Sequence, residues 1–123
     1  CRQQTEGMPL TQGNSSVDTQ TISDGVIVHV KGDIDFSRSP ELRQSLIGVL
    51  RGGLDRLIID LGGVSYMDSS GVAVLVEMLQ TQRKRNQKLV LCNMQPKVKG
   101  IFEIARLHMV FTIVDSVEDA QQA

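Results

Sequence analysis

The chain has 123 residues, of which 41% are hydrophobic and only 3% aromatic, and this suits one core of aliphatic side chains better than an aromatic-rich β-sandwich. Its 13 basic and 14 acidic residues give a formal net charge of -1, so nucleic acid is not an expected partner. No apolar run approaches the ~20 residues of a membrane span, so direct membrane contact is not expected either.

The first part of the chain predicts a polar tail followed by a β-hairpin. Residues 1–14 carry no apolar period and are expected to be a tail or an expression remnant, which leaves residues 15–123 as one domain. Strand-forming residues at 17–22 and 26–30 flank the turn signal Ser23-Asp24-Gly25, and this arrangement is typical of a hairpin.

Helical and strand patterns alternate after the hairpin. Ser39-Pro40-Glu41 has the residues of a helix start, with Ser39 as the N-cap, and Gly52-Gly53 ends that helix. Further patterns predict strands at 57–59, 89–92 and 111–114, and helices that begin near Ser70, near Val98 and at Ser116. The order predicts an α/β fold: a four- to five-stranded mixed, mainly parallel sheet with an N-terminal hairpin, covered by about four helices.

The sequence lacks the common signatures of enzymatic chemistry. It contains no G-x-x-x-x-G-K-[ST] loop, no G-x-G-x-x-G, no C-x-x-C and no H-E-x-x-H. His29, His108 and Cys92 lie in or beside apolar runs and are expected to be structural, so no catalytic residue, metal site or cofactor is predicted. The two widely separated cysteines, Cys1 and Cys92, favour a reducing compartment and hence the cytoplasm.

One turn stands out by its position. Tyr66-Met67-Asp68-Ser69-Ser70-Gly71 joins the strand region 57–65 to the following helix, so its hydroxyls are expected at a helix N-terminus beyond the carboxyl end of a strand. Free N–H groups and the positive end of the helix dipole favour a phosphoryl group there. Asp-Ser-Ser is also typical of ordinary N-capping, and the turn alone leaves both interpretations open.

The whole pattern resembles the STAS domain of bacterial anti-sigma factor antagonists over roughly residues 26–119. The resemblance is carried by Gly32-Asp33-Ile34-Asp35, 57–61, 64–71, 89–92, Pro96-Lys97-Val98 and Ile101-Phe102. It implies that Ser69 is phosphorylated by a GHKL-type serine kinase that is also the anti-sigma factor, and dephosphorylated by a PP2C-type phosphatase. The unphosphorylated protein, a monomer or weak dimer without enzymatic activity, would bind the anti-sigma factor and so release a sigma factor.

The expected partner surface combines acids with part of the helix after the turn. Its members are Asp33, Asp35, Asp68, Ser70, Gly71, Val74 and Met78. The resemblance places Asp35 beside the phosphoacceptor and Asp68 immediately before it, and Asp33 falls where the family also tends to have an acid. Val74 and Met78 are turned off the stripe of Val72, Leu75, Val76 and Leu79, so they form an apolar centre of this surface unless a broader core buries them.

Two other functions stay open. The same fold could serve as an accessory STAS subunit or domain of a membrane transporter or a lipid-transport complex, although the phosphorylatable Asp-Ser-Ser-Gly favours the switch. An enzyme with Ser69 as nucleophile is the weaker alternative, because the pattern supplies no base and G-x-S-x-G is absent.

Overall fold

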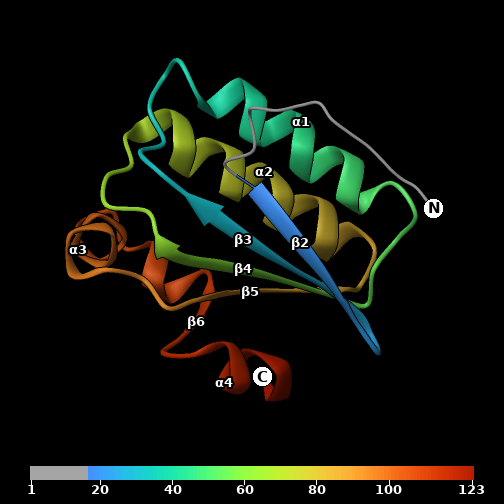
Figure 1. Cartoon of the computed structure of the whole chain (residues 1–123). Coiled ribbons are helices and arrows are strands. Elements are labelled where there is room, and N and C mark those ends of the chain that lie inside the picture. The colour runs from blue at the N-terminus through green and yellow to red at the C-terminus, as the bar shows by residue number, and fades with distance from the viewer. Residues whose placement is uncertain (1–16) are drawn as a thin grey trace.

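The computed structural model describes residues 17–123, whose strands form one five-stranded sheet in the order β2-β3-β4-β5-β6 (Figure 1). The strands are β2 (Val17–Ile22), β3 (Gly25–Lys31), β4 (Arg56–Gly63), β5 (Lys88–Cys92) and β6 (Thr112–Val114). β2 and β3 are antiparallel, and the other neighbours are parallel. The predicted hairpin and mainly parallel sheet are confirmed, whereas the tail predicted at 1–14 lies outside the described residues.

Helices connect and cover the strands. They are α1 (Ser39–Leu50), α2 (Ser69–Lys84), α3 (Pro96–Ile104), the 3-10 helix η2 (Leu107–Met109) and α4 (Val117–Gln122). In Figure 1, α1 and α2 lie side by side on one face of the sheet, and α4 lies beneath the other face. The predicted order of elements is confirmed, with η2 as an addition that the sequence pattern did not indicate.

The central strand β4 is buried on both faces because its side chains alternate between two apolar clusters. Leu57 and Ile59 belong to the larger cluster, which also contains Leu46 of α1 and Leu75 of α2. Ile58 belongs to the smaller cluster beneath α4. The larger cluster therefore holds the helices that follow β3 and β4 firmly against the sheet, and it fixes where their first turns lie.

The start of α1 differs from the sequence prediction. Ser39 is the first helical residue rather than the N-cap, and Arg38 occupies the N-cap position without a side-chain cap. The Asp35 carboxylate accepts hydrogen bonds from the N–H groups of Ser37 at 3.0 Å and Arg38 at 3.1 Å. The Asp35 carbonyl accepts the N–H of Ser39 at 2.8 Å, so Asp35 organises the turn that leads into α1, and Ser39 itself is only 6% exposed.

The last helix begins as its sequence indicates. Ser116 is the N-cap of α4, and its hydroxyl oxygen accepts a hydrogen bond from the N–H of Asp119 at 3.1 Å. Within residues 17–123, no helix combines the length and the apolarity that crossing a membrane would require.

Candidate functional site

Two loops at the carboxyl ends of neighbouring strands form the candidate site. Residues 32–38 follow β3 and residues 64–68 follow β4, on the left of Figure 1. The N–H of Ile34 donates to the carbonyl of Tyr66 at 2.9 Å, and Ile34 forms an isolated parallel bridge with Met67. Ile34 and Met67 are each 1% exposed, so the two loops are joined by main-chain bonds and by a shared buried contact.

Asp68 is the N-cap of α2 and is held by Ser70. Its Oδ1 atom accepts hydrogen bonds from the Ser70 N–H at 2.8 Å and from the Ser70 hydroxyl at 2.5 Å. These bonds, the one from the hydroxyl foremost, hold the pKa of Asp68 below its ordinary value. The carboxylate is therefore ionised at neutral pH, and the Ser70 hydroxyl is committed to it as a donor.

The other two acids of the site are paired with serines in the same way. Oδ1 of Asp35 accepts the Ser37 hydroxyl at 2.6 Å, which is the main reason that the pKa of Asp35 is lowered. Oδ1 of Asp33 accepts the Ser65 hydroxyl at 2.8 Å. In the described part of the chain, neither these two acids nor Asp68 forms a salt bridge, and the two loops hold these three acids but only one cation, Arg38, so the site carries a net negative charge.

Ser69 differs from the other serines of the site. It is the first residue of α2 and its side chain is exposed. Among residues 17–123, no group forms a hydrogen bond with its hydroxyl, whereas the hydroxyls of Ser37, Ser65 and Ser70 all donate to carboxylates. Of the serines in these two loops and the first turn of α2, Ser69 therefore presents the hydroxyl that is open to an incoming reagent.

A family comparison identifies the architecture around this turn. The model of the STAS domain matches residues 16–120. The chain belongs to the STAS domain family. The recognition made from the Gly-Asp-Ile-Asp and Asp-Ser-Ser-Gly segments is thereby confirmed.

Relatives of this STAS domain include proteins named as anti-sigma factor antagonists. The anti-sigma-B factor antagonist of Bacillus subtilis is 32% identical over 109 residues, which are 89% of this chain and 99% of that protein. An anti-sigma factor antagonist structure from Mycobacterium paratuberculosis matches with a TM-score of 0.81 at 22% identity, covering 92% of this chain and 97% of the other.

The fold of this STAS domain is also that of the Bacillus protein SpoIIAA, which has been solved in two covalent states. The phosphorylated form matches with a TM-score of 0.68 at 18% identity over 86% of this chain and 96% of that one. The unphosphorylated anti-sigma factor antagonist SpoIIAA matches with a TM-score of 0.65 at 18% identity over 84% and 91%.

Three residues expected at the partner surface are buried in this STAS domain. Val74 and Met78 are 6% and 1% exposed and belong to the larger apolar cluster, so the expectation that they form an exposed apolar centre is wrong. The reason is that α2 packs against both α1 and the sheet, which makes its buried stripe broader than one helical face. Gly71 is buried as well, and a Cβ there would lie 2.7 Å from side-chain atoms of Ile34 and Met67.

The sequence reasoning missed two exposed aromatic residues in the site of this STAS domain. Phe36 is 71% exposed and Tyr66 is 48% exposed, one on each loop. The chain has only one tyrosine, three phenylalanines and no tryptophan. Phe102 and Phe111 meet edge to face in the core with ring centroids 5.6 Å apart. The sequence does contain a signal for the exposure of Phe36 and Tyr66, because both lie among Asp and Ser residues and outside any apolar period.

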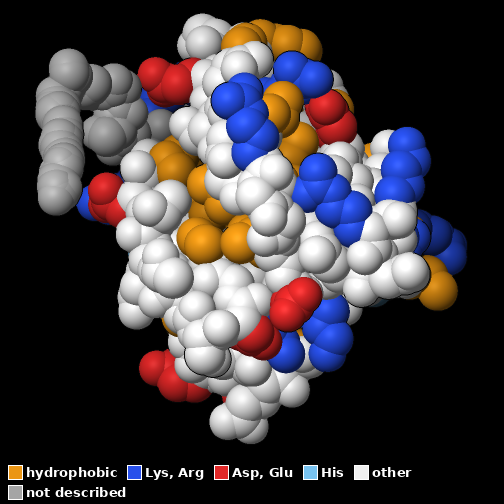
Figure 2. Space-filling model, turned by 90° about the vertical axis from the view of Figure 1, so that its right-hand side faces the viewer, with side chains coloured by type: hydrophobic (Ala, Val, Ile, Leu, Met, Phe, Trp, Pro, Cys, Tyr) orange, Lys and Arg blue, Asp and Glu red, His pale blue; other side chains and the backbone are white. Residues whose placement is uncertain are grey.

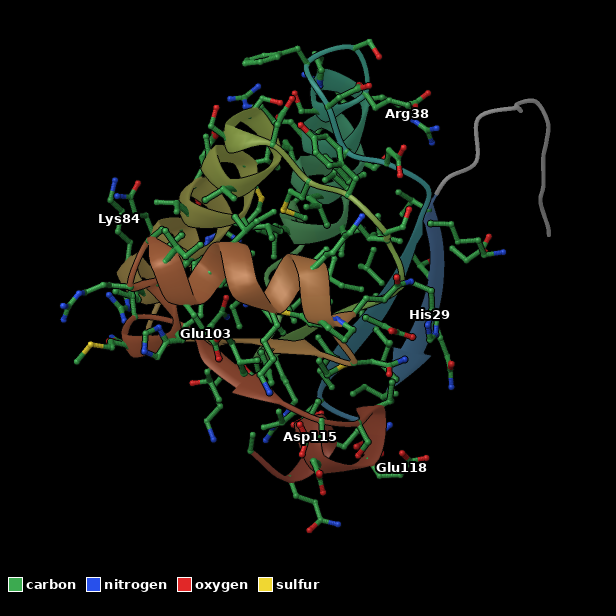
Figure 3. All side chains as sticks on the ribbon, turned by 90° about the vertical axis from the view of Figure 1, so that its left-hand side faces the viewer. His29, Arg38, Lys84, Glu103, Asp115 and Glu118 are labelled. Carbon is green, nitrogen blue, oxygen red and sulfur yellow. The ribbon has the colours of Figure 1, made fainter. Side chains whose placement is uncertain are left out.

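A second polar cluster lies on the α4 side of the sheet, away from Ser69. Nδ1 of His29, labelled in Figure 3, is 2.7 Å from Oδ2 of Asp60, and the Gly62 N–H donates to Oδ1 of Asp60 at 2.9 Å. Burial acts to raise the pKa of Asp60, but the hydrogen bonds from Gly62, His29 and Asn93 outweigh it and hold the pKa below its ordinary value. Nearby, burial raises the pKa of the Cys92 thiol to about 12, so this thiol stays protonated.

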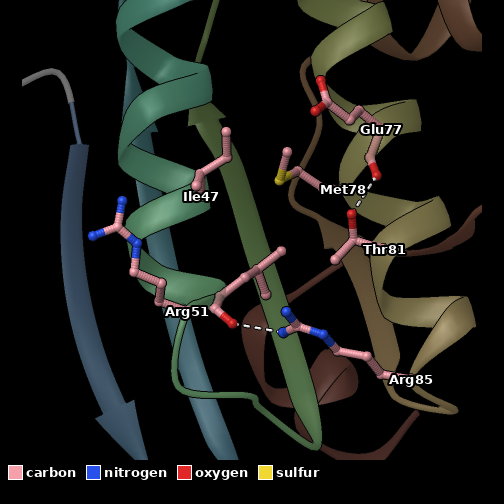
Figure 4. A pocket seen from close by; sticks show the side chains of 7 residues that line it. Ile47, Arg51, Glu77, Met78, Thr81 and Arg85 are labelled. Atoms are coloured by element: carbon pink, nitrogen blue, oxygen red, sulfur yellow. Dashed lines mark hydrogen bonds between the residues drawn. The ribbon is translucent and has the colours of Figure 1, made fainter.

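A groove of about 190 Å³ lies between α1 and α2, but it is not part of this site (Figure 4). It is lined by Ile47, Leu50, Arg51, Glu77, Met78, Thr81 and Arg85. These residues belong to the C-terminal halves of the two helices or, as Arg51 and Arg85 do, directly follow them, whereas Ser69 begins α2. Nη1 of Arg85 closes the groove at one end by donating to the Leu50 carbonyl at 2.6 Å. In the described part of the chain, no group of His, Cys, Asp and Glu residues is arranged to hold a metal ion.

Proposed function

We propose that this STAS domain is an anti-sigma factor antagonist whose binding to an anti-sigma factor is controlled by phosphorylation of Ser69. The main observation behind the proposal is that the Ser69 hydroxyl is exposed and forms no hydrogen bond with any described residue. The hydroxyls of the neighbouring serines, in contrast, donate to carboxylates. The name of the Bacillus subtilis relative and the two solved states of SpoIIAA support it. The protein acts by binding rather than by catalysis, in the cytoplasm, as a monomer or weak dimer.

The proposed partners supply the chemistry. A GHKL-type serine kinase, which is also the anti-sigma factor, transfers the γ-phosphoryl group of ATP to Oγ of Ser69, and the hydroxyl proton leaves to a group on the kinase. A PP2C-type phosphatase returns the hydroxyl by hydrolysis. Ser69 contributes an accessible oxygen at the start of α2, where the positive end of the helix dipole favours a phosphate, although Asp68 already accepts the N–H groups of Ser70, Gly71 and Val72.

Charge repulsion provides part of the switching free energy. A phosphate on Ser69 adds a charge of about -1.5 to -2 at neutral pH next to carboxylates that already lack cationic partners in the described chain. Two unit charges ~6 Å apart repel by roughly 0.7 to 3 kcal/mol for effective dielectric constants between ~80 and ~20. Moving a partner from nearly fully bound to nearly fully free requires about 5.5 kcal/mol. Steric exclusion and the cost of desolvating a phosphate in a packed interface provide the remainder.

The fold itself changes little on phosphorylation under this proposal. Asp68 and Ser70 already cap α2 through two hydrogen bonds that do not involve the Ser69 side chain. Backbone chemical shifts of the phosphorylated and free forms test this directly. We expect changes in the two site loops and the first turn of α2, and shifts spread across the five strands would contradict the proposal.

The decisive experiment compares adjacent serines. Candidate GHKL kinases and ATP are incubated with the wild type, Ser69→Ala and the matched control Ser70→Ala, and the products are mapped by mass spectrometry. We expect one phosphate on Ser69, none on Ser69→Ala, and retained phosphorylation of Ser70→Ala. In binding assays, Ser69→Ala should bind the kinase constitutively and Ser69→Asp should bind weakly. Phosphorylation of the Ser69→Ala variant to the wild-type extent would show that the wrong serine has been assigned.

A further inference from the structure

Two aromatic side chains project into solvent beside Ser69. Phe36 is 71% exposed and Tyr66 is 48% exposed, although the chain has few aromatic residues with which to build its core. Exposed aromatic rings that border a functional group are characteristic of protein interfaces, because a partner that covers them removes a large apolar area from water. These two rings are candidates for such a contact.

Both rings are attached to backbone that is held in place. The Tyr66 carbonyl accepts the Ile34 N–H at 2.9 Å, and the buried side chains of Ile34 and Met67 lie beneath the two loops. The pKa of the neighbouring Asp68 is lowered chiefly by the Ser70 hydroxyl, with the Phe36 N–H among the smaller contributors, so the Phe36 backbone faces this carboxylate. Rings on an ordered backbone lose little conformational freedom on binding, which favours affinity.

The charge around the rings indicates the chemistry of the partner. Asp33, Asp35 and Asp68 lie in the same two loops as the rings and form no salt bridge with any described residue, whereas Arg38 is the one cation in residues 32–38 and 64–68. Lys and Arg side chains gather on the face that contains the C-terminal ends of α1 and α2 (Figure 2). The two site loops therefore present apolar rings together with a net negative charge, and the complementary surface is apolar with a basic border.

We infer that Phe36 and Tyr66 are the apolar anchors of the partner interface, and that they enter a pocket of the anti-sigma factor kinase bordered by Lys or Arg. The inference rests on the proposed function, since the occupant is the protein whose binding Ser69 controls. Tyr66 lies three positions before Ser69, and the Phe36 N–H faces the adjacent Asp68, so on this inference a partner that encloses the two rings also covers the Ser69 hydroxyl. A phosphate on Ser69 would then disrupt the contact between the two rings and the kinase pocket, although the phosphate itself touches neither ring.

The chain offers a matched control on another surface. Met109 of η2 is 72% exposed, almost the same as Phe36, and η2 lies beside the edge strand β6 rather than beside β3 and β4. Removing its side chain deletes a similarly exposed apolar group without touching the site. Since Phe36 and Met109 are largely exposed and Tyr66 is about half exposed, their alanine variants are expected to fold as the wild type does.

The test uses the full chain and the purified GHKL kinase that phosphorylates it on Ser69. Calorimetric titration without ATP compares the wild type, Phe36→Ala, Tyr66→Ala, Tyr66→Phe, Met109→Ala and Ser69→Asp, after thermal unfolding has shown that each variant is folded. We expect at least a tenfold rise in Kd for the two site alanine variants. Met109→Ala should remain within twofold of the wild type, and Tyr66→Phe, which keeps the ring, should stay within a few-fold.

The outcomes separate this inference from the proposed function. If Ser69→Asp weakens binding while Phe36→Ala and Tyr66→Ala bind as the wild type does, the assignment of the two rings as anchors is wrong, but the proposed control by phosphorylation is supported. If Met109→Ala weakens binding as much as the site variants do, the kinase covers a different surface and the inference also fails. If Ser69→Asp and the phosphorylated chain bind like the wild type, the proposed function is wrong and the inference falls with it.

Discussion

Gly71 and Ile34 meet so closely that a Cβ on Gly71 would lie 2.7 Å from Cγ2 of Ile34. The contact joins the first turn of α2, two residues after the exposed Ser69, to the loop that follows β3. The glycine of the Asp-Ser-Ser-Gly segment is thus explained by packing, because a larger residue would push the two loops of the site apart.

Gly71→Ala should therefore destabilise the protein, by about 1 to 3 kcal/mol, because the methyl group must displace the Ile34 and Met67 side chains. Gly48→Ala is the matched control, since a Cβ at this exposed position of α1 meets no atom within 4 Å. We expect Gly48→Ala to stabilise the fold by about 0.4 to 1 kcal/mol. Urea unfolding measures both values, and equal stability of Gly71→Ala and the wild type would contradict the packing account.

Met78→Ala should lower stability without a direct effect on partner contact. The side chain is 1% exposed in the larger apolar cluster, so its loss costs about 2 to 5 kcal/mol through lost burial and a cavity. Met109→Ala removes the same side chain at 72% exposure and should change the unfolding free energy by less than about 0.5 kcal/mol. Similar unfolding midpoints for the two variants would show that α2 does not pack as described.

Asp60→Asn should destabilise the protein at neutral pH by about 1 to 3 kcal/mol, because the charged hydrogen bonds to His29 and Gly62 are lost or weakened. The folded-state pKa of Asp60 lies below its ordinary value of 3.8, so its contribution is present above that value and is lost as the pH falls through the folded pKa. The difference from the wild type should therefore shrink as the pH falls below about 4.

Denaturant titrations at several pH values measure this dependence. Asp55→Asn serves as the control, since Asp55 is exposed and its side chain makes no hydrogen bond to the described residues. A deficit of Asp60→Asn that is the same at pH 7 and pH 3 would exclude an ionised Asp60 as the source of the stabilisation.

A fluorine label can report on the site without any substitution. Tyr66 is the single tyrosine of the chain, so fluorotyrosine incorporation yields one 19F resonance from the site. We expect this resonance to shift or broaden when the unlabelled kinase binds, because the ring becomes enclosed. The chain phosphorylated on Ser69 should keep its free-state resonance at the same kinase concentration. An unchanged resonance in a complex that calorimetry confirms would place Tyr66 outside the interface.

Salt should weaken the complex if the partner is basic. Asp33, Asp35 and Asp68 are accessible charges without salt bridges in the described chain, and ions screen such charges within about 8 to 10 Å at 0.1 to 0.15 M ionic strength. We expect Kd to rise steadily as NaCl is raised from ~50 to ~500 mM, with the slower association rate as its main source. A Kd that is independent of salt would indicate a partner surface without the basic border.

Most of the secondary structure followed from local signals. The hairpin of β2 and β3 was readable from β-branched runs around Ser23-Asp24-Gly25, and the start of α2 from Asp68-Ser69-Ser70. Such signals work because strand pairing across a tight turn and helix capping involve residues only a few positions apart. For the same reason, the sequence by itself determined that a hydroxyl lies where α2 begins.

The tertiary structure decided what surrounds that hydroxyl. Asp33 and Ser65 are 32 positions apart, and only the parallel pairing of β3 with β4 brings them to a 2.8 Å hydrogen bond. Packing of α2 against both α1 and the sheet likewise buried Val74 and Met78. Which serine stays open, and which apolar groups face solvent, depends on neighbours contributed by distant segments. Local periodicity carries no information about those neighbours, since they meet only when the sheet has formed.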